Sequence, residues 1–99
     1  MIVIAGTGAL APENTEAFMA AANEMAAASR AEEGNLEYCF SVEAPGKVRF
    51  FEIWESEEAL GAHFAAPHMA AFGAAISELG ITGMDGKKYE VASVSPLFG

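Results

Sequence analysis

The chain has one cysteine, five basic residues and one tryptophan among its 99 residues. A single thiol, Cys39, cannot close an internal disulfide, so folding does not depend on an oxidising compartment. The excess of 14 acidic over five basic residues gives a formal charge of −9, which argues against binding nucleic acid or an anionic membrane. Residues 1–16 carry no basic leader, and their apolar run is too short for a signal peptide or a span, so we expect a cytoplasmic protein.

Apolar residues, in contrast, are abundant and make up 53% of the sequence. A chain of this length folds as one domain, which we place at residues 1–99. Such a domain hides only about two-thirds of its unfolded surface, so part of this apolar surface needs another cover. We therefore expect a homodimer.

The hydrophobic patterns predict an α+β fold. Residues 35–43 alternate, with Leu36, Tyr38, Phe40 and Val42 on one face. The expected elements are a strand at about 2–8, a helix from Pro12 to about Ala31, strands at 35–43 and 48–55, a helix from Ser56 that is broken at Pro67 and resumes to 79, and a strand at about 88–95. This β-α-β-β-α-β order predicts the ferredoxin-like arrangement with a four-stranded antiparallel sheet.

The strand at 48–55 is apolar on both faces, which is typical of a strand covered on both sides. We expect helices on one face and a partner chain on the other, so the homodimer would form through the sheet face. Glu52 has the same strand parity as Trp54, and an acid on an aromatic face must be paired, hydrated or protonated. We expect Glu52 to find its partner on another element, such as Lys47, Arg30 or a histidine.

Residues 50–72 contain the three side chains best suited to an aromatic ligand, namely Trp54, His63 and His68. Each also has an ordinary structural interpretation. Trp54 can be a core residue, His63 can cap a helix end, and His68 can open the next helix. Alternatively, one or both histidines line a pocket, where a neutral imidazole can exchange a proton near pH 7.

Other motifs have weak support. Residues 6–11 (GTGALA) match the dinucleotide fingerprint, but the second parallel strand that this fold needs is missing, so we interpret them as a strand exit. His63 and His68 are five residues apart with Pro67 between them, and no third ligand is obvious, so we expect no metal. Cys39 has no basic neighbour in the sequence to activate it. We therefore expect no metal and no cofactor.

Several of these segments together resemble the antibiotic biosynthesis monooxygenase family. Its pattern is approximately E-x-G-x-x-x-Y, then a strand ending Y-E-x-W, an acidic-Ala-Leu helix start and H-x-x-x-P-H. The matching segments are 33–38 (EGNLEY), the turn near Pro45-Gly46, 50–54 (FFEIW), 58–60 (EAL), His63 and Pro67-His68.

The resemblance implies a ferredoxin-like protomer that pairs into a dimeric α/β barrel. It also implies a cofactor-independent oxygenase, in which the substrate supplies the electrons that reduce O₂. The haem-degrading branch uses an asparagine in its first strand, and residues 2–8 contain none, so we do not expect haem degradation. By position, Trp54 matches the family tryptophan that lines the pocket, His63 and His68 match the family histidines, and Tyr38 and Glu52 match recurring strand residues. We expect catalytic roles for His63, His68 and Glu52, and substrate-binding roles for Trp54, Tyr38, Phe40 and Phe72.

The sequence thus supports one leading hypothesis and one rival. The first is a monooxygenase that oxidises a small phenolic or quinol-type aromatic to a quinone with O₂. The rival is a homodimer of the same fold, associated with stress or with binding small aromatics, that keeps the pocket without turnover.

Overall fold

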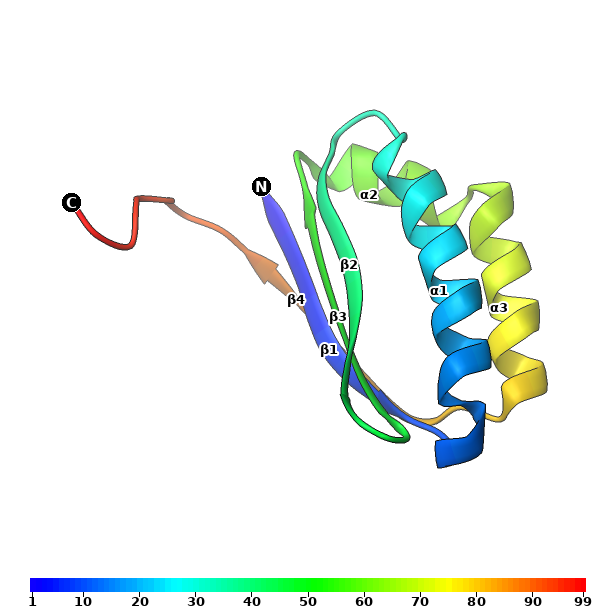
Figure 1. Ribbon diagram of the computed structural model, residues 1–99. Helices are drawn as coiled ribbons and strands as arrows, with labels where there is room; N and C mark the ends of the chain where they lie inside the picture. The colour runs from blue at the N-terminus through cyan, green and yellow to red at the C-terminus, as the bar shows by residue number, and fades with distance from the viewer.

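Three helices cover one face of a four-stranded sheet, and the opposite face carries no helix (Figure 1). The computed structural model describes residues 1–99. Its elements are β1 (Ile2–Ala9), η1 (Pro12–Asn14), α1 (Thr15–Arg30), β2 (Asn35–Ala44), β3 (Lys47–Trp54), α2 (Glu57–Phe64), α3 (Pro67–Leu79) and β4 (Thr82–Glu90). All neighbouring strands are antiparallel, in the order β2-β3-β1-β4. The α+β ferredoxin-like fold predicted from the sequence is confirmed.

Local signals in the sequence account for the helix boundaries. The side chain of Ser56 accepts a hydrogen bond from the backbone N–H of Ala59 at 3.2 Å and caps α2. Pro67 occupies the first position of α3, as the predicted break requires. Gly80 ends α3 with φ of 68°, a left-handed conformation that glycine adopts without strain. No helix has the length and apolarity needed to cross a membrane.

The last strand is the element whose predicted position was wrong. We expected it at about 88–95, but β4 spans Thr82–Glu90. Every residue of β4 is exposed, because it is an edge strand outside the helix layer, so it shows no alternation of buried and polar positions. The turn expected at 83–86 lies inside the strand, where the pairing register shifts opposite Thr7 and Ala9.

The core lies between the sheet and the helices. In the β1–β3 register, Ile2 pairs with Trp54 and Ile4 with Glu52, so these four residues share the helix-covered face. The fully buried side chains include Trp54, Phe18, His63 and Val48.

On β2, the predicted alternation holds only in the middle of the strand. Tyr38 is buried and Phe40 is half-buried, whereas Leu36 and Val42 are 53% and 45% exposed. Leu36 lies at a register shift between Asn35 and Glu37, which takes it out of the alternation. Val42 still pairs with the buried Val48, but it lies on an edge strand and remains partly exposed.

The glycines of residues 6–11 make room for a side chain and do not form a phosphate loop. Gly6 and Gly8 lie within β1, between two antiparallel neighbours, so the strand-to-helix turn of a dinucleotide site is absent. A Cβ at Gly6 would overlap the backbone oxygen of Asp85 and lie 2.6 Å from Cζ of Phe50. The Phe50 ring therefore keeps its position only because Gly6 has no side chain.

We predict that Gly6→Ala destabilises the protein by about 1–3 kcal/mol, because the new methyl group overpacks the sheet. Gly61→Ala is the matched control: nothing lies within 4 Å of its Cβ, and it should stabilise α2 by up to about 1 kcal/mol. Urea unfolding of both variants measures the two effects. Equal stability of G6A and the unmodified chain would contradict this account of the Phe50 packing.

Candidate functional site

A cavity of about 300 Å³ lies between the sheet and the helices. Its walls come from all four strands and all three helices, and they are mostly apolar. The lining residues are Ile4, Met25, Tyr38, Phe40, Phe50, Glu52, His63, Phe64, Met69, Phe72, Gly73, Ile76 and Met84. This volume is at the lower end of the range for small-molecule pockets and suits one or two fused aromatic rings.

Glu52 is the one carboxylate in the cavity wall. Its side chain is buried, and its Oε1 accepts a hydrogen bond from Nε1 of Trp54 at 2.9 Å. Burial raises the pKa of Glu52 above its ordinary value, although the hydrogen bonds from Trp54 and Tyr38 oppose this effect. The expected partners Lys47, Arg30 or a histidine were wrong, because the indole two residues along the same strand face supplies the hydrogen bond.

Tyr38 and His63 form the polar corner of the cavity. Their rings are 5.3 Å apart, and the Tyr38 hydroxyl lies 3.5 Å from Nε2 of His63. Burial, followed by the negative charge of Glu52, raises the pKa of Tyr38 far above its ordinary value. Tyr38 therefore remains a neutral phenol that can donate a hydrogen bond.

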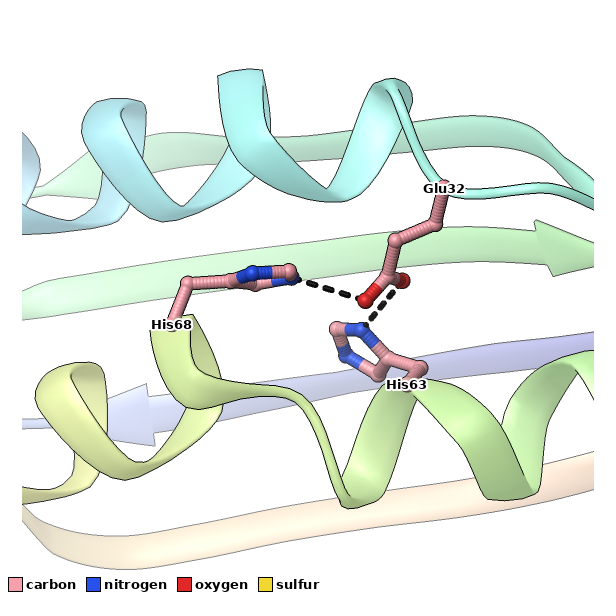
Figure 2. Close-up of side chains that lie close together, drawn as sticks. All are labelled: Glu32, His63 and His68. Atoms are coloured by element: carbon pink, nitrogen blue, oxygen red, sulfur yellow. Dashed lines mark hydrogen bonds and ion pairs between the residues drawn. The ribbon is translucent and has the colours of Figure 1, made fainter.

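Behind His63, the carboxylate of Glu32 bridges the two histidines (Figure 2). Glu32 Oε2 lies 2.8 Å from Nδ1 of His63, and Oε1 lies 2.8 Å from Nε2 of His68. Burial lowers the pKa of His63 despite the nearby Glu32 carboxylate. Because a carboxylate can only accept, the neutral imidazole of His63 carries its proton on Nδ1 and presents Nε2 as an acceptor towards Tyr38.

Sequence reasoning missed Glu32. It directly follows the α1 C-cap, Ala31, in the turn that leads to β2, and 31 residues separate it from His63. The signal was present, because Glu32, Gly34 and Tyr38 fit the E-x-G-x-x-x-Y pattern. The reasoning that Pro67 separates the histidines was also wrong, since their rings lie 5.9 Å apart and both contact Glu32.

The structure divides the predicted site residues into two groups. Tyr38, Phe40, Glu52, His63 and Phe72 line one cavity. Trp54 and His68 do not line it.

The two residues outside the cavity lie behind its wall. Trp54 is fully buried, with its ring 4.6 Å from that of His63. His68 faces a separate groove between α1 and α3. Any influence of either residue on a ligand therefore passes through Glu52 or His63.

Comparison with known proteins agrees with this fold. The sequence model of the antibiotic biosynthesis monooxygenase family matches residues 1–75. The chain belongs to this family.

The chain is 30% identical over 98 residues to an uncharacterized protein of Synechocystis sp., and the match covers 97% of this chain and 67% of that protein. A crystal structure from Deinococcus radiodurans, described as a candidate antibiotic biosynthesis monooxygenase, superposes with a TM-score of 0.92 at 26% identity and covers 100% of both chains. A Bacteroides thetaiotaomicron protein of unknown function, described as a candidate oxidoreductase, has a TM-score of 0.81 at 29% identity. That match covers 91% of this chain and 96% of the other.

The raised pKa of Glu52 predicts a pH-dependent stability. Because the folded state holds the Glu52 proton more tightly than the unfolded state, the stabilising effect of that proton is complete at pH values below the unfolded pKa. It is lost as the pH rises through the folded pKa. Glu52→Gln should therefore become more stable relative to the unmodified protein at pH 7 than at pH 4, as measured by urea unfolding at both values.

Glu55→Gln provides the control for this experiment, because Glu55 is exposed at the end of the same strand. Its stability relative to the unmodified protein should change little between the two pH values. A relative stability of E52Q that is the same at pH 4 and pH 7 would show that its surroundings do not raise the pKa of Glu52.

Proposed function

We propose that the protein is a cofactor-independent monooxygenase that oxidises a small phenolic or quinol-type aromatic to a quinone with O₂. The observation that carries this proposal is one buried carboxylate, Glu52, in a cavity with aromatic walls. Membership of a family named for monooxygenases supports it. The aromatic ring would lie among Tyr38, Phe40, Phe50 and Phe72, with its hydroxyl towards Glu52 and His63.

The first step is removal of the phenolic proton by Glu52. A carboxylate with a raised pKa is a stronger base than an exposed one, and an apolar surrounding strengthens its interaction with the hydroxyl. The Nε1–H of Trp54 fixes the orientation of the carboxylate. The Tyr38 hydroxyl lies at the same corner, beside His63 Nε2, and can donate a hydrogen bond to the substrate oxygen.

The phenolate then supplies all the electrons. In a phenol with hydrogen at the para carbon, O₂ bonds to that carbon, and the proton held by Glu52 passes to the resulting peroxide. Loss of the proton on that carbon, again to Glu52, breaks the O–O bond and leaves a second carbonyl. The released hydroxide takes this proton and departs as water, so one oxygen atom enters the quinone and the other enters water.

The decisive experiment uses 1-naphthol under ¹⁸O₂. We expect 1,4-naphthoquinone with one labelled oxygen atom, formed at a rate proportional to protein concentration and absent without O₂. Glu52→Gln should lower this rate about 100-fold or more, because it removes the base while keeping the acceptor for Trp54. Mass spectrometry measures the label, and oxygen uptake measures the rate.

Glu55→Gln is the matched control for this experiment and should retain the full rate. Equal rates with and without protein, for 1-naphthol and for hydroquinone in air, would contradict the proposal. If Trp54 fluorescence then reported saturable binding of 1-naphthol, the non-catalytic binding protein would be the better conclusion.

We further propose that two copies pair through the sheet face that no helix covers. Phe51 and Ile53 point to this face and are only half-buried in the single chain. An apolar sheet face that is left open in a chain of 53% hydrophobic residues favours a second copy as its cover.

Light scattering coupled to gel filtration tests this pairing. We expect a mass of two copies of the 10.3 kDa chain, and Phe51→Lys should shift it towards one copy, because the lysine would lie in the interface. Leu36→Lys changes an exposed leucine on β2 and should leave the mass of two copies unchanged. A single-copy mass for the unmodified protein would contradict the pairing.

A further inference from the structure

The Glu32, His63 and His68 cluster has more ligand capacity than its hydrogen bonds use. Each of the three residues offers one ligand atom, and these atoms all lie within 4.8 Å of one another. They come from three separate places in the chain, namely the turn after α1, the last turn of α2 and the first turn of α3. Figure 2 shows the three side chains converging on one point between these segments.

His68 provides the most telling detail of this cluster. Its Nε2 is buried and lies 2.8 Å from Glu32 Oε1, yet the two atoms do not align as a hydrogen bond. A buried ring nitrogen that lacks a hydrogen bond is costly. A ligand placed on the Nε2 lone pair, beside the carboxylate, would satisfy it.

We propose that Glu32, His63 and His68 bind one divalent first-row transition-metal ion through Nδ1 of His63, Nε2 of His68 and a carboxylate oxygen. Two imidazoles and one carboxylate form a donor set that suits Zn²⁺, Co²⁺ and Fe²⁺. Ligand atoms about 2.1 Å from one ion lie about 3 to 3.4 Å apart. The two separations of 2.8 Å run to different oxygens of Glu32 and need to widen by a few tenths of an ångström. The ligand atoms all lie within 4.8 Å of one another, so any pair farther apart than about 3.4 Å needs to draw together around the ion.

Access and charge also favour a cation at this position. His68 lines a groove of about 250 Å³ between α1 and α3, whose other lining residues include Glu24 and several alanines. This groove gives a route to the cluster that does not pass through the aromatic cavity. The chain's net charge of −9 raises the local concentration of cations around it.

The ion would also change what His63 presents to the cavity. Without metal, the Nδ1 proton points to Glu32 and Nε2 is an acceptor. A metal on Nδ1 requires the proton to be on Nε2, so His63 would become a donor towards Tyr38. Metal binding therefore couples the α1–α3 groove to the cavity wall through the tautomer of one residue.

The test uses untagged protein that has been stripped with a chelator and titrated with Co²⁺. We expect visible absorption that saturates at one ion per chain and is displaced by Zn²⁺. Glu32→Gln and His68→Gln should each weaken Co²⁺ binding by about tenfold or more, since each loses a direct ligand. The glutamine at position 68 keeps a polar nitrogen near Glu32, and circular dichroism checks that each variant is folded.

Glu33→Gln is the matched control, because Glu33 is the exposed acidic neighbour of Glu32 and the substitution removes the same charge. It should bind Co²⁺ like the unmodified protein. Equal weakening by E32Q and E33Q, or no saturable absorption in the unmodified protein, would overturn the proposal. The measurement needs neither O₂ nor an aromatic substrate, so it is independent of the proposed oxygenase activity.

Nitrogen-15 NMR of the histidine rings tests the tautomer change directly. Adding Zn²⁺ should move the proton of His63 from Nδ1 to Nε2, which exchanges the chemical-shift pattern of its two nitrogens. An unchanged His63 pattern at saturating Zn²⁺ would show that His63 is not a ligand and would overturn the three-residue site.

Discussion

The hydrogen bond between Trp54 and Glu52 is the interaction on which the cavity depends. The two residues are neighbours on the inner face of β3, so strand geometry alone brings the indole N–H to the carboxylate. Without this donor, a buried acid between aromatic rings would lack its strongest partner. With it, Glu52 is held in one orientation while burial raises its pKa. The strand thus positions a buried carboxylate without any long-range ion pair.

A second network, formed by Glu32 with the two histidines, meets the first at Tyr38 and His63. Tyr38 is linked to Glu52 and also lies 3.5 Å from His63 Nε2. The cavity is therefore polar at one corner only, and elsewhere it is lined by apolar side chains. A ligand with one hydroxyl on an aromatic ring would match this distribution, because the only hydrogen-bonding side chains in the cavity wall lie at that corner.

Much of the fold and part of the site could be predicted from local patterns. The period of the strands placed Glu52 and Trp54 on one face, and Ser56, Pro67 and Gly80 fixed the helix boundaries. These features depend on residues close together in the chain. The position of β4 was not predictable in this way, because an exposed edge strand has no buried side to produce alternation.

Glu32 was missed for a different reason. Its contacts join segments 31 residues apart or more, and they exist only because α1 and α3 pack side by side on the sheet. The same packing explains why Trp54 lies behind the cavity wall although its residue type favours ring binding. The alternation along a strand predicts which face of the sheet a side chain lies on, but not how far it lies from the cavity. His63 and Tyr38 pack against the indole of Trp54 and fill the space between it and the cavity.

The two networks place different demands on His63. As part of the cavity wall, it presents Nε2 as an acceptor towards the Tyr38 hydroxyl, which requires the proton to be on Nδ1. As a metal ligand, it must give up that proton position. Both demands can be met by one side chain only at different times, because the imidazole has two nitrogens and one proton when neutral. The carboxylate of Glu32 favours the first state, and in the proposed metal site Glu32 and His68 would supply the other ligands for the second, so metal binding would change what His63 presents to the cavity.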